Sequence, residues 1–276
     1  MSINETVLEM HYHKPLMDLF RDAFGLGENG QINFYKYSPQ RECFIGFDQA
    51  YVKTQISEDE LFRVLKESAA SNSYVLKDTF VGYYLQFKVV KQMKKRTQST
   101  PSCITSNPHY RVQLSTKKNQ NTGFSQHEHL WNLKSNKGAM VYYACPMIFE
   151  REDLYDIDID LETLRLVDVE SCPSEYSDNG SHSIYFNDQV CDPFWCSEPV
   201  RGVGISPRNF AQLLVEQIND EGRARESAIS LLKTLEVARE NAKKSNRKVE
   251  NSIDSINDFN ILANILTVVR VSRQME

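Results

Sequence analysis

Three residues in this sequence could together carry out phosphodiester chemistry. Asp48 lies in an aromatic and β-branched stretch, and Gln86 and Lys88 lie two residues apart in the strongest predicted strand, 80–90. Because side chains alternate along a strand, Gln86 and Lys88 leave the same face. Hydrolysis of a phosphodiester at neutral pH needs a divalent cation held by oxygen atoms, and a water molecule activated by that cation and a nearby positive group. An aspartate, an amide oxygen and a lysine on adjacent strands would supply those parts.

The order of the elements around these residues resembles the PD-(D/E)XK nuclease superfamily, the restriction-endonuclease-like fold, in its Gln-x-Lys variant. The resemblance covers residues 5–145 at most, with the predicted helix at 57–70 as an insertion. It implies an αβββαβ core and a bound Mg²⁺ (or Mn²⁺). Four side chains would surround the metal: Glu9 (with Glu5 one turn away on the same helix), Asp48, Gln86 and Lys88.

The resemblance also implies a role for each residue. Asp48 would bridge metal and phosphate, and Gln86 would bind the metal through its carbonyl together with the backbone of Phe87. Lys88 would orient the attacking water and stabilise the developing charge. Glu9 would support the metal through water. The residues themselves leave another interpretation open, in which Asp48 and Lys88 form an ordinary cross-strand ion pair.

Charge is distributed unevenly along the chain, which has a net charge of -5. Residues 79–127 contain eight basic residues and no acid, whereas residues 147–198 contain fourteen acids and two arginines. Because the local potential depends on where charges lie, a basic block in an acidic protein can bind a polyanion. A solvated surface is the alternative. The predicted nucleic-acid-binding residues are Lys91, Lys94, Lys95, Arg96, Arg111, Lys117 and Lys118.

Histidines and cysteines offer a weaker metal hypothesis. His127 and His129 are two apart on a predicted helix and therefore do not share a face, so they make a poor metal clamp. One of them could face phosphate, although a capping or surface role is the simpler interpretation. The candidate ligands of a zinc site are Cys172, His182, Cys191 and Cys196. They lack the CxxC spacing typical of zinc sites, and the alternative is that the cysteines are buried thiols.

The predicted elements define an α/β protein with a mixed central sheet flanked by helices. A helix capped by Asn4 ends near Gly25, and strands at 31–37 and 43–53 form a hairpin. A helix follows at 57–70, and then the strand at 80–90. Further elements are a strand at 110–114, a helix at 125–134, and strands at 140–145, 164–169 and 183–186.

The C-terminal part is predicted to be a helical hairpin. Ser206 and Pro207 open a long helix, and a last helix carries Ile256, Phe259, Leu262, Leu266 and Val269 at helical spacing. The hairpin packs on the main domain or forms a homodimer through a coiled coil. We therefore predict three regions: a nuclease-like α/β core at 1–146, an acidic irregular and β extension at 147–205, and the hairpin at 206–276.

Composition indicates a folded protein of the cytoplasm. The chain has 276 residues, of which 41% are hydrophobic, and it contains no apolar run of the roughly 18 residues that span a bilayer. Its acidic, histidine-containing start is not that of an export signal. We expect no membrane partner, and a metal-dependent nuclease acting on DNA in restriction or antiphage defence. The alternative is a catalytically inactive protein of the same fold that binds nucleic acid or a partner protein.

Overall fold

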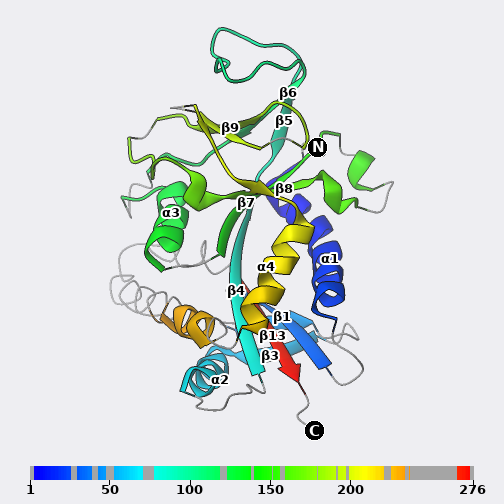
Figure 1. Cartoon of the computed structure of the whole chain (residues 1–276), viewed down its shortest axis with the longest axis vertical. Helices are drawn as coiled ribbons and strands as arrows, with labels where there is room; N and C mark the ends of the chain where they lie inside the picture. Colours follow the sequence, from blue (N-terminus) through cyan, green and yellow to red (C-terminus); the bar gives the residue numbers. More distant parts are fainter. Residues whose placement is uncertain are drawn as a thin grey trace, which may run out of the picture. The chain divides into compact units, whose positions relative to one another are not determined.

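The computed structural model describes most of the chain (Figure 1). The described residues are 3–25, 30–38, 43–47, 53–70, 78–118, 123–137, 140–150, 152–155, 159–178, 180–190, 192–196, 199–220, 225–233, 236 and 266–273. They form two compact units. The first unit comprises residues 1–19, 85–135 and 141–210, and the second comprises residues 20–84, 136–140 and 211–276. Each unit therefore combines segments that are distant in the sequence.

The second unit contains five strands in the order β4-β13-β1-β2-β3. Their bounds are β1 Gly30–Ser38, β2 Cys43–Phe47, β3 Lys53–Ser57, β4 Asp78–Phe87 and β13 Leu266–Arg273, with only the last three residues of β4 in the first unit. Neighbouring strands in this order pair antiparallel. Helix α2, Glu58–Ala70, follows β3 directly, as the sequence predicts. A helical segment at 225–233 packs Leu231 against Gly82 of β4.

Strand β13 corrects the prediction of a C-terminal helical hairpin. Leu266 and Val269 lie in this strand, where Val269 pairs with Val81 and with Phe34. The helical spacing of the apolar residues led to a wrong prediction here. The segment also contains β-branched residues, which favour strands: Thr267, Val268, Val269 and Val271. Ile256, Phe259 and Leu262 lie outside the described residues. The described part of this segment thus gives no helix through which the predicted homodimer could form.

The predicted strand at 43–53 is two strands. β2 and β3 pair antiparallel, with Phe47 opposite Lys53, so the chain reverses direction between them. Asp48 lies outside the described residues. The predicted hairpin is confirmed, because β1 and β2 pair antiparallel with Phe34 opposite Phe47.

The first unit contains most of helix α1, Glu5–Phe24, and an antiparallel three-stranded segment. Its strand order is β12-β8-β7, with bounds Gly204–Ile205, Leu164–Asp168 and Met140–Pro146. The main-chain N–H of Lys88, just after β4, donates to the carbonyl of Ala144 in β7 at 2.9 Å. Helices α3, Gln126–Lys137, and α4, Pro207–Asn219, both begin in this unit. Short 3₁₀ turns are η1 Glu152–Leu154, η2 Leu161–Thr163 and η3 Val169–Ser171.

A second sheet of the first unit has five antiparallel strands in the order β11-β10-β9-β6-β5. Their bounds are Val200–Arg201, Phe194–Cys196, Ser183–Phe186, His109–Gln113 and Val90–Met93. One face is apolar and fully buried along a row formed by Val90, Val112, Ile184 and Trp195, at 3%, 0%, 0% and 0% exposure. Because side chains alternate, the residues between them lie on the opposite face, here called the outer face.

Two helix starts have the caps that the sequence predicts, and a third has a capping box that was not predicted. The Asn4 side chain accepts from the N–H of Val7 at 2.9 Å, and Ser206 accepts from the N–H of Asn209 at 3.2 Å. Ser125 and Glu128 cap each other reciprocally, which is a capping box. Pro15 lies inside α1, which continues through it to Phe24, and Gly25 follows at a φ of 54°. The predicted α/β class is confirmed.

None of the helices described here is both long enough and apolar enough to cross a membrane.

Candidate functional site

Lys88 is a buried lysine whose ammonium group is fully hydrogen-bonded. The residue is 2% exposed. Its Nζ donates to Glu5 Oε1 at 3.0 Å, to Gln126 Oε1 at 2.9 Å and to Ser115 Oγ at 3.3 Å. An ammonium group has three donors, so these three acceptors satisfy it. Burying a charge is costly unless it is paired and hydrogen-bonded, and the Glu5 carboxylate provides the opposite charge.

Gln86 connects Glu5 and Gln126, the carboxylate and the amide that bind Lys88. Its Oε1 accepts from Gln126 Nε2 at 2.9 Å, and its Nε2 donates to Glu5 Oε2 at 3.2 Å and to the carbonyl of Phe87 at 3.0 Å. Lys88, Gln126, Gln86 and Glu5 thus form a closed ring of hydrogen bonds, here called the Lys88 ring. Because lysine can only donate and a carboxylate can only accept, the ring fixes the orientation of both amides.

Four elements bring these side chains together. Glu5 is the first residue of α1. Gln86 is the penultimate residue of β4, and Lys88 directly follows that strand. Gln126 is the first residue of α3, held there by the capping box, and Ser115 lies just beyond β6. Gln86 and Lys88 share a face, as their spacing predicts. The carboxylate that contacts them is that of Glu5; Glu9 lies one turn further along α1 and is half-buried.

Sequence reasoning missed Ser115 and Gln126. Ser125, three residues before a glutamate, fixes where α3 begins and therefore marks Gln126 as a first-turn residue. Nothing local indicates which strand this turn faces, because the contact joins residues 40 positions apart in the sequence. Ser115 follows a short strand in a polar stretch that resembles any loop. Both residues are identifiable only through tertiary structure.

The oxygen atoms around Gln86 are of the kind that a hard divalent cation binds. One carboxylate (Glu5), one amide oxygen (Gln86) and one backbone carbonyl (Phe87) match the donor chemistry of Mg²⁺, which takes one or two carboxylates from protein. Gln86 Oε1 is engaged by Gln126 in the Lys88 ring, so this oxygen becomes available only when that hydrogen bond opens. Among the residues the structure describes, no group of three or more His, Cys, Asp or Glu could hold a metal.

The strand order of the second unit corrects one assumption about Asp48. β13 and β1 lie between β4 and β2, so β2, which ends one residue before Asp48, does not neighbour the strand of Gln86. Phe47 lies in register with Phe34, then Val269 and then Val81 of β4. β4 and β2 were expected to be adjacent because they are consecutive in the αβββαβ order once α2 is set aside. Two features account for the difference: the C-terminal strand β13 was not predicted, and β1 rather than β2 lies on the β4 side of the hairpin.

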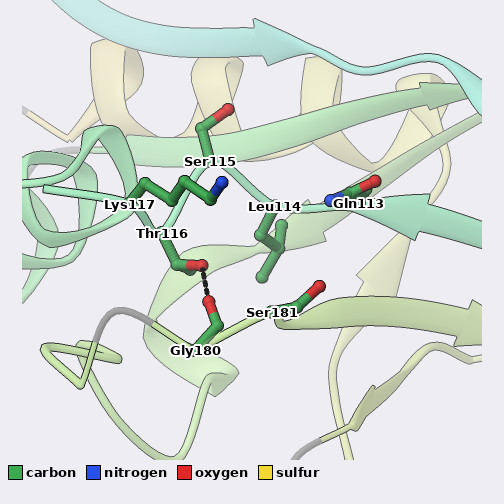
Figure 2. Close-up of a pocket in the computed structure, with 7 residues that line it drawn as sticks. All are labelled: Gln113, Leu114, Ser115, Thr116, Lys117, Gly180 and Ser181. Atoms are coloured by element: carbon green, nitrogen blue, oxygen red, sulfur yellow. Dashed lines mark hydrogen bonds between the residues drawn. The ribbon is translucent and has the colours of Figure 1, made fainter.

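A pocket of about 480 Å³ adjoins the Lys88 ring through Ser115. Figure 2 shows its lining, in which Lys117 extends along the same rim as Ser115 and Thr116 bonds to the carbonyl of Gly180. The volume lies in the range of ligand pockets, about 300–1,000 Å³. Lys117 is exposed and has no hydrogen-bond or ion-pair partner among the described residues. The other lining residues are Gln113, Leu114 and Ser181.

The seven predicted nucleic-acid-binding residues differ in their surroundings. Lys118 is paired with Glu128 at 3.5 Å, and Arg111 donates to Ser183 Oγ at 3.1 Å with its guanidinium over the Tyr185 ring. The remaining side chains are exposed and, in the described part of the chain, have no acidic partner: Lys91, Lys94, Lys95, Arg96 and Lys117. The predicted basic block is thus largely at the surface, and part of its charge is already neutralised.

A buried cluster around His127 lies in the same unit. His127 is 0% exposed, with Nδ1 2.8 Å from Tyr143 Oη and Nε2 3.2 Å from the carbonyl of Ser174. Since a carbonyl only accepts, Nε2 carries the proton and Nδ1 accepts from Tyr143. The Cys172 thiol donates to the same carbonyl, and burial raises the pKa of Cys172 to about 11. This is a neutral, structural cluster rather than an activated nucleophile.

The contacts of the proposed zinc ligands do not support a zinc site. His182 stacks on Tyr176 with ring centroids 3.9 Å apart and bonds to Asp178 at 2.7 Å. Cys196 is half-buried on β10, and Cys191 lies outside the described residues.

His127 predicts a pH dependence of stability. Burial lowers the pKa of His127 from its ordinary 6.5 to about 4. The unfolded chain therefore binds a proton at this residue before the folded chain does, so stability falls as pH drops from 6.5 toward 4, by about 3 kcal/mol in full. Replacing His127 by glutamine should flatten this part of the curve of unfolding free energy against pH, measured by urea denaturation. A glutamine at His11 serves as control, and parallel wild-type and His127→Gln curves would contradict the assignment.

Comparison with known proteins gives no relative: no family model, curated protein or solved structure matches this chain.

Proposed function

We propose that this chain is a metal-dependent phosphodiester hydrolase acting on nucleic acid, with the Lys88 ring as its catalytic centre. The observation that carries the proposal is the buried Lys88 ammonium, held by Glu5 and linked to Gln86, at the edge of a polar pocket. A buried, charged lysine beside a pocket is a candidate for stabilising charge that develops during reaction. DNA is the proposed substrate, with restriction or antiphage defence as the proposed setting.

Lys88 has one hydrogen bond that a substrate can replace. The contact with Ser115 is the longest of the three, at 3.3 Å, and Ser115 is the partner that lines the pocket. A phosphate oxygen or water molecule in the pocket could take the place of the hydroxyl at little cost, because Glu5 and Gln126 continue to hold the ammonium. Lys88 would then orient the attacking water and stabilise negative charge on the phosphate.

Glu5, Gln86 and the carbonyl of Phe87 would hold the Mg²⁺ or Mn²⁺. When bound, the ion would act as a Lewis acid on the phosphate and lower the pKa of a coordinated water. The Gln126 hydrogen bond would have to open and the Gln86 amide to turn over first, because Nε2 and not Oε1 faces Glu5 and the Phe87 carbonyl in the ring. Glu9, one turn further along α1 from Glu5, remains the proposed further carboxylate of this centre.

The experiment is a cleavage assay with the full chain. Labelled single- and double-stranded oligonucleotides of DNA and RNA are incubated with Mg²⁺ or Mn²⁺, and in parallel with EDTA. We expect shortened products that require the ion. Absence of products from every substrate with both metals would remove the proposal.

The closed Lys88 ring favours a second candidate, a protein that binds nucleic acid without hydrolysing it. With the Ser115 contact, every donor of Lys88 and both polar atoms of Gln86 are already hydrogen-bonded, so these groups are satisfied without substrate or metal. Salt-dependent binding without products would favour this candidate, since phosphate contacts release counterions.

A further inference from the structure

One row of side chains crosses all five strands of the second sheet on its outer face. The pairing places these residues directly opposite one another: Lys91 of β5, Arg111 of β6, Tyr185 of β9, Phe194 of β10 and Arg201 of β11. Residues that are directly opposite in neighbouring strands project from the same face. Four strand spacings of about 4.8 Å give this row a length of roughly 19 Å. Cations thus lie at its ends and aromatic rings at its centre.

The positive charge of this row is concentrated toward β5 and β6. Arg201 is neutralised by Asp192, with contacts of 3.0 and 2.6 Å. Lys91 is exposed and has no acidic partner among the described residues. Arg111 stacks its guanidinium 5.8 Å from the Tyr185 ring centroid, bonding only to a serine hydroxyl among the contacts described. This end of the outer face therefore suits a polyanion.

The outer face continues along β6 to the Lys88 ring. From Arg111 to Lys117 the side chains alternate, with Arg111, Gln113, Ser115 and Lys117 outward and the residues between them buried. The hydrogen bond from the N–H of Leu114 to the carbonyl of His182 extends the pairing beyond β6. Figure 2 shows Gln113, Ser115 and Lys117 on this stretch. One line of polar and cationic side chains thus leads from the row to the hydroxyl that contacts Lys88.

We infer that the outer face of this sheet binds a single nucleic-acid strand, which crosses Lys91 and Arg111 and places one nucleotide in the pocket beside Lys117. That the nucleotide is then cleaved at Lys88 rests on the proposed function; the binding does not.

The aromatic residues select a single strand over a duplex. Single-strand sites combine a cationic groove with aromatic side chains on which bases stack, and arginine planes contribute as well. Tyr185 is only 7% exposed and lies under the Arg111 plane. The stacking surfaces of the row are therefore the half-exposed Phe194 ring and the Arg111 plane. A duplex keeps the faces of its bases stacked inside and would find only the cations. An acidic protein would likewise leave the aromatic centre without a partner.

Binding of a fluorescein-labelled oligonucleotide of about 12 nucleotides, within the usual site size of sheet-based single-strand binders, is measured by anisotropy in EDTA. Charge reversals Lys91→Glu and Lys117→Glu involve exposed side chains that have no acidic partner in the described part of the chain, so we expect the fold to be unaffected. Each should weaken binding about tenfold and flatten the slope of log K against log salt by about 0.7 per lost phosphate contact. Phe194→Ala should weaken binding by about tenfold through lost stacking.

Arg208→Glu, an equal change of charge at an exposed residue of α4, is the matched control and should change affinity less than about threefold. Because binding is measured in EDTA, absence of cleavage by the wild type in Mg²⁺ with binding intact bears on the catalytic proposal alone. Equal weakening by Arg208→Glu and Lys91→Glu, unchanged binding in both reversals, or tighter binding of a duplex than of its single strand would overturn the inference.

Discussion

Replacing Lys88 by methionine is expected to lower the rate of nucleic-acid cleavage by about 10²–10³-fold, the usual cost of removing one preorganised group that stabilises transition-state charge. Methionine keeps most of the apolar stem that packs in this buried position and removes the ammonium. The Glu5, Gln126 and Ser115 contacts are lost together. No other cation is described in contact with these three residues, so nothing else would supply the charge.

The measurement is the initial rate with Mg²⁺ at saturating oligonucleotide, with far-UV circular dichroism as a check that the variant is folded. Lys14→Met is the control, because Lys14 is an exposed lysine of α1 paired with Asp18. A Lys88→Met rate within about twofold of wild type, when the expected loss is two orders of magnitude or more, would remove Lys88 from the reaction.

Glu5→Ala is expected to lower the free energy of unfolding by about 1–2 kcal/mol. The change leaves the Lys88 ammonium, at 2% exposure, with neutral acceptors only, and hydrogen bonds to charged groups contribute about 1.5–3 kcal/mol. Solvent reduces the effect, because the Glu5 side chain is 42% exposed and water can reach its position. Gln86 Nε2 would also lose one of its two acceptors.

Urea denaturation of wild type, Glu5→Ala, Lys88→Met and the double variant measures this coupling. The double variant should be more stable than the sum of the single losses predicts, since the charge that Glu5 compensates is then absent. Asp18→Ala breaks the exposed Lys14–Asp18 pair of the same helix and should cost less than about 0.5 kcal/mol. Additive losses at Glu5 and Lys88 would mean that the two charges do not stabilise each other.

The candidate site could be predicted where it depends on local geometry. The two-residue spacing of Gln86 and Lys88 fixed their common face, because strand alternation is a property of the backbone. Their partners are set by packing: Glu5 instead of Glu9 faces the end of β4, depending on how α1 is rotated about its axis. Gln126 and Ser115 come from segments 38 and 27 residues away from Lys88. No local pattern encodes those distances.

The fold shows the same division between local and non-local information. Helix starts with a capping side chain, such as Asn4, follow from hydrogen bonds within one turn, and the sequence predicts them correctly. The prediction of a helix at 266–273 was wrong. The apolar spacing of this segment is compatible with a helix, but its β-branched residues favour a strand, and its pairing with β1 and β4 decides for the strand. These partners lie more than 180 residues away in the sequence. The order of the strands in the sheet is therefore the property that the sequence does not predict.

Strand register shows which side chains of the basic block, residues 79–127, lie next to one another. As a sequence the block was a run without acids, consistent with a polyanion site or with a solvated surface. Register places Lys91 beside Arg111, whereas packing pairs Lys118 with Glu128. Two neighbours in sequence, Lys117 and Lys118, thus differ in available charge, and only the first lines the pocket.

The most direct test of the catalytic proposal is a crystal structure of the chain with Mn²⁺ and a non-cleavable oligonucleotide, read through the anomalous signal of manganese. The proposal predicts a peak within about 2.3 Å of a Glu5 carboxylate oxygen and of Gln86 Oε1, with the Gln126 hydrogen bond to Gln86 opened and a phosphate oxygen near Lys88 Nζ. An intact Lys88 ring with no manganese at Glu5, while the oligonucleotide is bound, would contradict it.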